Sequence, residues 1–187
     1  MKCPKCEYLG FEEVDRCRNC GYEFALSHST PLSELQETLD MQIKLRDMQN
    51  VMNVSLRFLD SVKEQLKQAQ STMKGLAKEP DKDLMKALED YVKEVDALQD
   101  KLTARDDGLG FAGRSGVADD IGQLYFSLDT NFGPTRGQRD YFGEIQPAYR
   151  AGMGDVNKFL RETLPQWNEK LRGWNAPTLT TRKPFEF

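Results

Sequence analysis

Residues 41–76 are MQIKLRDMQNVMNVSLRFLDSVKEQLKQAQSTMKGL, and this stretch decides the fold. Apolar or small residues recur in it at alternating steps of four and three: Met41, Leu45, Met48, Met52, Ser55, Leu59, Val62, Leu66, Ala69, Met73 and Leu76. This is the a/d pattern of helices that pack side by side. Helical character begins at Leu32, so the sequence predicts a helix of about 45 residues, nearly 70 Å long at about 1.5 Å per residue. A helix of this length needs partner helices.

The first partner follows a break at residues 78–81, Lys-Glu-Pro-Asp. Pro80 suits the first turn of a new helix, and Asp81 and Asp83 lie favourably near the positive end of its dipole. The same four–three spacing then returns at Leu84, Leu88, Tyr91, Val95, Leu98 and Leu102. Because the connection is short, the two helices should form an antiparallel hairpin. The second helix is shorter, so the amino-terminal half of the first needs another cover.

Residues 106–116 are rich in glycine and should form a loop between helices. Gly108, Gly110 and Gly113 match the G-x-G-x-x-G pattern of dinucleotide-binding sites. That pattern binds phosphate only where it follows a buried strand and opens a helix, whereas a polar helix precedes it here. The sequence therefore favours a connecting loop.

Two further amphipathic helices are expected after this loop. The first is marked by Val117, Ile121, Leu124, Tyr125 and Leu128. Thr135 and Gln138 form a capping box for the second. Its apolar positions are Phe142, Ile145, Tyr149, Met153, Val156, Leu160, Trp167, Leu171 and Trp174. Because each proline removes one helix hydrogen bond, Pro147 and Pro165 predict bends near 143–147 and 161–165.

Together these segments predict an all-α protein: an antiparallel, coiled-coil-like bundle of about four helices, two of them long, over residues 32–174. Residues 175–187 should be an extended C-terminal tail. Residues 1–27 should form a separate small unit, joined through a polar linker at 28–31 that contains His28, the only histidine.

The amino-terminal unit holds all four cysteines, as two C-x-x-C brackets: Cys3, Cys6, Cys17 and Cys20. Each bracket aims two sulfurs at one point, and two brackets complete the tetrahedral thiolate site that zinc prefers. A segment this short cannot bury enough apolar surface to fold unaided, so metal binding there would also be folding. Gly21 follows the second bracket, where the chain must turn with positive φ, but Glu7 occupies the equivalent place after the first.

Other uses of four cysteines are disulfide bonds or a redox dithiol. The chain begins Met-Lys-Cys without an apolar stretch typical of a signal peptide, which favours a reducing, cytoplasmic location. A redox C-x-x-C would precede a helix in a β-α-β context that is absent here. Iron uses the same four ligands in rubredoxin-like sites, although the ten-residue gap between the brackets suits a minimal zinc ribbon better.

Composition limits the partners and the chemistry. Charged residues make up 30% of the chain, the mean hydropathy is −0.66 and the net charge is −4. No basic stripe offers a phosphate-binding surface, and no run is long and apolar enough to cross a membrane. One histidine cannot supply the Glu-x-x-His pairs of a di-iron bundle, and no Ser–His or Cys–His pair is available for nucleophilic catalysis. The sequence therefore predicts no enzyme.

Two resemblances to known families add to this interpretation. Residues 1–26, CPKCEYLGFEEVDRCRNCGYEFAL with the first two residues before it, resemble the zinc ribbon at the amino terminus of many bacterial proteins, including RDD-type membrane proteins. Residues 33–187 are similar to the carboxy-terminal helical region of bacterial sortilin-like proteins with neuraminidase-type repeats. The likeness rests on Pro134-Thr135-x-x-Gln138-x-x-Tyr141 and Leu164-Pro165-x-x-Asn168-x-x-Leu171. Those repeats form β-propellers, which this chain lacks, so the resemblance implies no activity.

The expected function is that of a non-enzymatic interaction or scaffold protein, with Zn²⁺ in the ribbon and a protein partner or self-association through the helices. One alternative is a nucleic-acid-binding ribbon with a helical dimerisation arm, which the near-neutral ribbon disfavours. Another is an accessory helical region left from an exported sortilin-like protein, fused to the ribbon.

Overall fold

The structure is a computed structural model that describes residues 5–9, 16–20, 30–76, 81–103, 116–128 and 132–187. Over these residues the fold is all-α, as predicted. The elements are α1 (Leu32–Leu76), α2 (Lys82–Asp100), α3 (Val117–Ser127), α4 (Arg136–Lys158), the π-helical segment η2 (Phe159–Thr163) and α5 (Leu164–Gly173).

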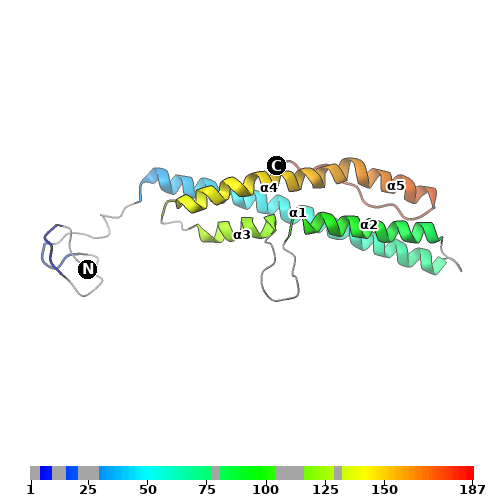
Figure 1. Ribbon diagram of the computed structural model, residues 1–187, viewed down its shortest axis with the longest axis horizontal. Coiled ribbons are helices and arrows are strands. Elements are labelled where there is room, and N and C mark those ends of the chain that lie inside the picture. Colours follow the sequence, from blue (N-terminus) through cyan, green and yellow to red (C-terminus); the bar gives the residue numbers. More distant parts are fainter. Residues whose placement is uncertain (1–4, 10–15, 21–29, 77–80, 104–115, 129–131) are drawn as a thin grey trace.

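The bundle is built on α1, which extends along its whole length (Figure 1). α2 packs antiparallel on the C-terminal half of α1, and α3 covers the N-terminal half that the sequence left uncovered. α4, η2 and α5 follow one another as a third layer, which contacts α1 and α3 through α4. No helix among the described residues combines the length and the apolar character needed to span a membrane.

The heptad positions of α1 and α2 form the core. Eight of the predicted a/d residues of α1 are buried, whereas Met48 and Met73 are half-buried. The side chain of Leu76 lies outside the described residues. All six predicted positions of α2 and the turn after it are buried as well. The spacing therefore identified the packed face of both helices correctly.

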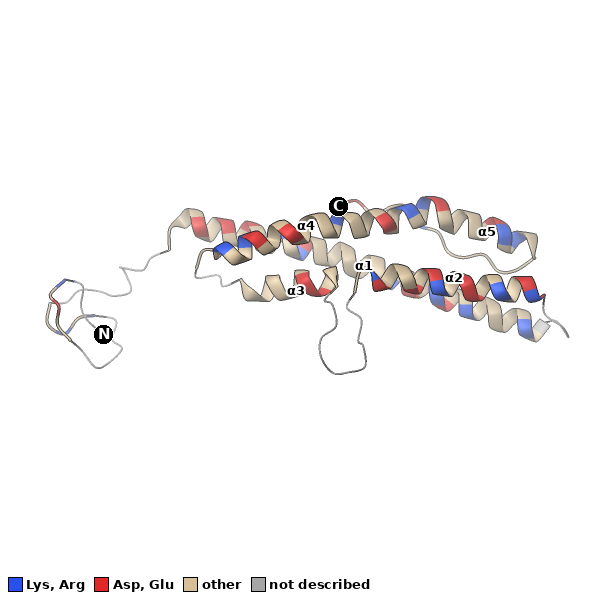
Figure 2. Cartoon of the chain, in the orientation of Figure 1, with Lys and Arg blue, Asp and Glu red and all other residues tan. Residues whose placement is uncertain are grey.

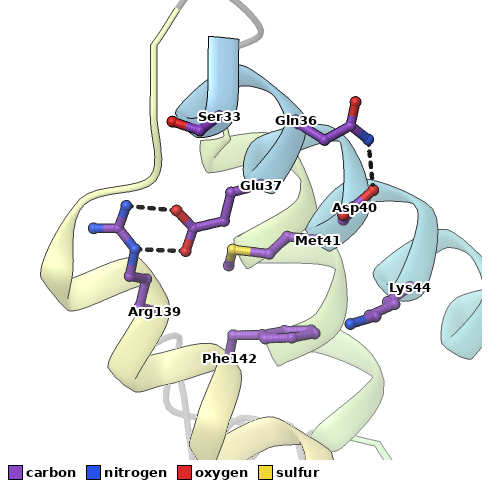
Figure 3. A pocket seen from close by; sticks show the side chains of 8 residues that line it. All are labelled: Ser33, Gln36, Glu37, Asp40, Met41, Lys44, Arg139 and Phe142. Carbon is purple, nitrogen blue, oxygen red and sulfur yellow. Dashed lines mark hydrogen bonds and ion pairs between the residues drawn. The ribbon is translucent and has the colours of Figure 1, made fainter. Parts of the chain in front are cut away.

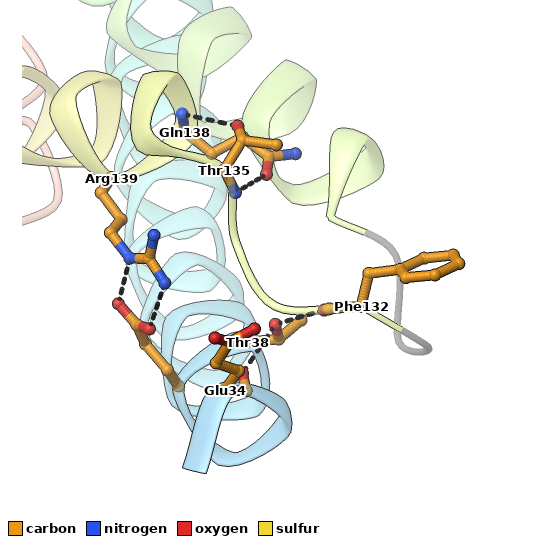
Figure 4. Close-up of polar contacts among 7 residues, drawn as sticks. Glu34, Thr38, Phe132, Thr135, Gln138 and Arg139 are labelled. Carbon is orange, nitrogen blue, oxygen red and sulfur yellow. Dashed lines mark hydrogen bonds and ion pairs between the residues drawn. The ribbon is translucent and has the colours of Figure 1, made fainter. Parts of the chain in front are cut away.

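Local side-chain hydrogen bonds begin two of the helices. Asp81 precedes α2 and accepts hydrogen bonds from the backbone N–H groups of Asp83 (2.8 Å) and Leu84 (3.2 Å). The helix thus begins at Lys82, directly after Asp81, and Pro80 lies outside the described residues. Before α4, the Gln138 N–H donates to Thr135 Oγ1 (3.2 Å) and the Thr135 N–H donates to Gln138 Oε1 (2.8 Å; Figure 4). This is the capping box that the sequence predicts.

The two internal prolines have different outcomes. Helix α4 continues through Pro147 from Arg136 to Lys158. Near the second proline the helix widens instead, and the Leu164 N–H donates to the carbonyl of Phe159, five residues earlier. Pro165 then lies at the start of α5, directly after this widened turn. The predicted bends stay predictions, and the second one overlaps the π-helical segment.

Helix α5 ends in a chain reversal at Asn175, whose φ of 53° lies in the left-handed region. The Ala176 N–H donates to the Leu171 carbonyl (2.9 Å) and the Asn175 N–H to the Arg172 carbonyl (3.0 Å). This is the Schellman arrangement, in which asparagine tolerates the positive φ. It sends the C-terminal tail, residues 175–187, back along the bundle without regular secondary structure (Figure 1).

Candidate metal centre

Three of the four predicted ligands lie together. The thiols of Cys6, Cys17 and Cys20 are all within 4.8 Å of one another, and Cys6 Sγ lies 3.6 Å from Cys17 Sγ. Cys17 is buried, whereas Cys6 and Cys20 are half-buried. None of the three is in a disulfide bond. The fourth predicted ligand, Cys3, lies outside the described residues.

These distances can be compared with a metal–thiolate tetrahedron. With a Zn–S bond of about 2.3 Å, the edge of a regular tetrahedron, which joins two sulfurs, is roughly 3.8 Å. The Cys6–Cys17 separation agrees with this edge and is far longer than the S–S bond of about 2.05 Å in a disulfide. The three thiols are therefore close enough to hold a metal ion. Iron–thiolate sites use the same ligand set, so the geometry does not identify the metal.

The backbone directly after Cys6 turns with a positive φ. Glu7, directly after the first bracket, has a φ of 58°, at the position where the sequence calls for a left-handed residue. The pKa of the Cys6 thiol is lowered to about 6, mainly by the hydrogen bond from Asn19 Nδ2 (3.5 Å) and then by the backbone N–H of Tyr8. Both donors stabilise the thiolate, which is the form that binds metals.

A second concave site lies between α1 and α4. This open pocket of about 400 Å³ has Met41 and Phe142 on its apolar side and Glu37, Lys44 and Arg139 among its charged groups (Figure 3). Arg139 donates to both carboxylate oxygens of Glu37, at 2.6 and 2.7 Å, and this lowers the pKa of Glu37. Because the arginine and the glutamate engage each other, the pocket is best explained as the surface around an ion pair that joins α1 to α4.

The segment before α4 is also attached to α1. The hydroxyl of the buried Thr38 lies 2.8 Å from the carbonyl oxygen of Phe132 and 3.1 Å from that of Glu34 (Figure 4). A Cβ atom at Gly133 would come within 2.7 Å of the Cβ of Glu34, so only glycine permits this approach. These contacts fix the N-terminal end of the bundle and offer no reactive group.

Both acidic and basic residues occur along α1, α2, α4 and α5, whereas α3 carries acidic residues alone (Figure 2). The two signs often pair across elements, as in Lys63–Asp96 (2.6 Å) and Lys101–Asp155 (2.9 Å). Binding to nucleic-acid phosphates requires clustered lysines and arginines that release counterions. The described helices present no such cluster.

Sequence reasoning missed two residues with a clear structural role, Asn157 and Asn168. Both are buried polar residues, and their side chains hydrogen-bond to the main chain of the C-terminal tail. The available signal was their position beside apolar residues in a helix, where an asparagine must find a partner. Asn168 also belongs to the motif on which the sortilin-like resemblance rests.

No family model matches the chain, and neither curated proteins nor solved structures give a significant match. The two family resemblances therefore stay predictions from the motifs.

Proposed function

We propose that the chain is a non-enzymatic interaction protein in which an amino-terminal ribbon binds one Zn²⁺ through Cys3, Cys6, Cys17 and Cys20. The helical bundle provides the surface for a protein partner or a second copy. The observation that carries the proposal is the cluster of three thiols within 4.8 Å of one another, two of them 3.6 Å apart. Lowering of the Cys6 pKa by neighbouring N–H groups supports it, since a thiolate binds Zn²⁺ better than a thiol.

The composition of the ligand set supports zinc in particular. Four thiolates form a closed structural site, with no position left open for substrate water, so the metal would stabilise the fold rather than catalyse a reaction. Free thiols also suit a reducing compartment. The bundle would serve as the interaction arm, and the exposure of the apolar residues Leu39 and Ile43 on α1 supports this role.

Metal analysis of protein purified without added metal tests the proposal. We expect about one zinc per chain in the wild type and in the control Lys5→Ala, whose side chain is exposed and is no ligand. Cys17→Ser should lose the metal. A red, iron-containing protein would contradict zinc, and a metal-free wild type would contradict the site itself. Retention on heparin that falls steeply with salt would instead support the nucleic-acid-binding alternative.

A further inference from the structure

The C-terminal tail is held mainly through its backbone. Asn168 Nδ2 donates to the Leu179 carbonyl (3.0 Å), and the Leu179 N–H donates to Asn168 Oδ1 (2.6 Å). Asn157 repeats this arrangement with Phe185, at 2.9 Å to its carbonyl and 2.7 Å from its N–H. The N–H of Thr180, the residue after Leu179, donates a hydrogen bond to Oε1 of Gln65 on α1 (2.7 Å). We call Gln65, Asn157 and Asn168, with the aromatic residues Phe58 and Tyr149, the tail-binding surface.

Side chains of the tail also contact the bundle, and several of them are three residues apart. Ala176 and Leu179 are buried. The guanidinium of Arg182 lies 4.0 Å from the ring centroid of Phe185 and 5.7 Å from that of Phe58 on α1. Ala176, Leu179, Arg182 and Phe185 are three residues apart, and Phe187, two residues further on, adds an edge contact with Tyr149 of α4 (5.7 Å between ring centroids). Three residues per turn is the repeat of a polyproline II helix, whose backbone has no internal hydrogen bonds and can bind side chains such as these asparagines.

The distances along the two partners agree with an extended segment. Asn157 and Asn168 are eleven residues apart, roughly 16 Å at about 1.5 Å per residue. Leu179 and Phe185 are six residues apart, which is about 19 Å at 3.1 Å per residue in polyproline II but only about 9 Å in an α-helix. Only an extended segment can reach both asparagines.

The tail-binding surface requires an occupant. Within the part of the chain that the structure describes, the two asparagine side chains hydrogen-bond to the tail and to no other group. Both are about 95% buried with the tail in place, at 6% and 5% exposure. If the tail leaves, these amides lose every such partner at once. Another extended segment would restore them.

The connection to the tail allows such an exchange. The reversal depends on one residue, Asn175, in the left-handed region. If Asn175 adopted an extended conformation, the tail would project away from its own bundle with all of its contacting residues intact. Short hinges of this kind favour exchange of an element between identical chains.

From these observations we propose that the tail-binding surface is a peptide-binding site whose partner is a second copy of this chain, with residues 176–187 of each copy replacing those of the other. The sequence that fits the surface is the tail itself, and every copy carries it. The resident tail has a high effective concentration, which opposes exchange. The exchanged dimer should therefore form only as the protein concentration rises. The proposal does not depend on the metal centre and would hold if the ribbon bound no zinc.

Two complementary full-length variants test it. The surface variant, Asn157→Ala with Asn168→Ala, keeps an intact tail; the tail variant, Leu179→Asp with Phe185→Ala, keeps an intact surface. Neither should exchange with itself, but a mixture should form a 1:1 dimer of twice the 21.4 kDa chain mass in light scattering. A control variant with all four substitutions should dimerise with neither. A mixture that stays at the mass of one chain overturns the proposal.

A labelled peptide of residues 175–187 gives an independent measurement. It should bind the tail variant in fluorescence anisotropy, at least tenfold more weakly once Asn157→Ala and Asn168→Ala are added, and a scrambled peptide should not bind. Peptide binding without a mixed dimer overturns the second copy as partner, and no peptide binding overturns the site. Circular dichroism checks the fold. If the tail variant loses helix, Arg182→Ala replaces it, since that side chain is exposed.

Discussion

Replacing Leu66 by alanine should destabilise the bundle strongly. Leu66 lies on α1 opposite α2 and has no exposed surface. The substitution removes three carbon atoms, and at about 0.8 kcal/mol per buried methylene the lost transfer free energy is about 2.4 kcal/mol. The cavity left behind adds to this, and measured Leu→Ala changes in cores are about 2–5 kcal/mol. With a urea m-value of about 2 kcal/mol/M, the unfolding midpoint should fall by about 1–2.5 M.

The neighbouring substitution Lys67→Ala is the matched control. Its side chain is 55% exposed and forms an exposed ion pair with Glu64 (2.8 Å), a type of contact that contributes little to stability. Urea unfolding of both variants, followed by far-ultraviolet circular dichroism, compares a core and a surface position in the same turn of the same helix. Equal midpoints for the two variants would refute the packing of α2 on α1.

Three more outcomes are expected. Gly154→Ala should stabilise α4 by up to about 1 kcal/mol through helix propensity. Gly152→Ala should not, because its Cβ would lie 2.6 Å from Cδ2 of the buried Leu102. Such overpacking costs about 1–3 kcal/mol. Thermal melts of both variants decide this, and a more stable Gly152→Ala would contradict the close contact. Burial raises the pKa of Tyr149 from 10.0 to about 12. Burial and the hydrogen bond to Asp120 raise the pKa of Tyr141 from 10.0 to about 12 as well. The folded state thus favours the neutral phenols. Their contribution to the free energy of unfolding is complete below pH 10 and should be lost as the pH rises through 12. Phenolate absorbance that rises entirely near pH 10 would contradict this prediction. Chelation with EDTA should leave the helicity and thermal midpoint of the bundle unchanged, because no described ribbon residue belongs to its core; a large loss of helix would show that the metal supports the whole fold.

The helices of the bundle were predictable because their signals are local. A four–three spacing defines one apolar face of a helix whatever packs on it, so the buried positions of α1 and α2 follow from the sequence. The capping box at Thr135 and Gln138 is likewise contained within four residues. The C-x-x-C spacing is a local signal too, although the contact between Cys6 and Cys17 joins two brackets that are eleven residues apart.

The π-helical turn and the tail contacts were not predictable, because they depend on residues far apart in the chain. Pro147 and Pro165 have the same local effect, yet only the second adjoins a change in helix type. Phe159, one residue outside the predicted apolar face, is buried together with Leu160. A surface helix with a single apolar face should not bury such adjacent residues. This stretch is covered on a second side as well, and the sequence does not show by what.

Adjacent buried pairs explain why the two asparagines occur where they do. Val156 and Asn157 are both buried, as are Trp167 and Asn168. In each pair the apolar residue packs into the bundle core, and the asparagine beside it binds the tail. The third layer therefore has two different faces on neighbouring residues. The apolar face can pack against any core of the right shape. The polar face can form its hydrogen bonds only with an extended backbone. Buried amides gain little net stability from hydrogen bonds but lose much when left without a partner, so the asparagines specify the conformation of the bound segment more than its affinity. An exchanged tail from a second copy has the same sequence, so it can form the same hydrogen bonds to both asparagines as the resident tail.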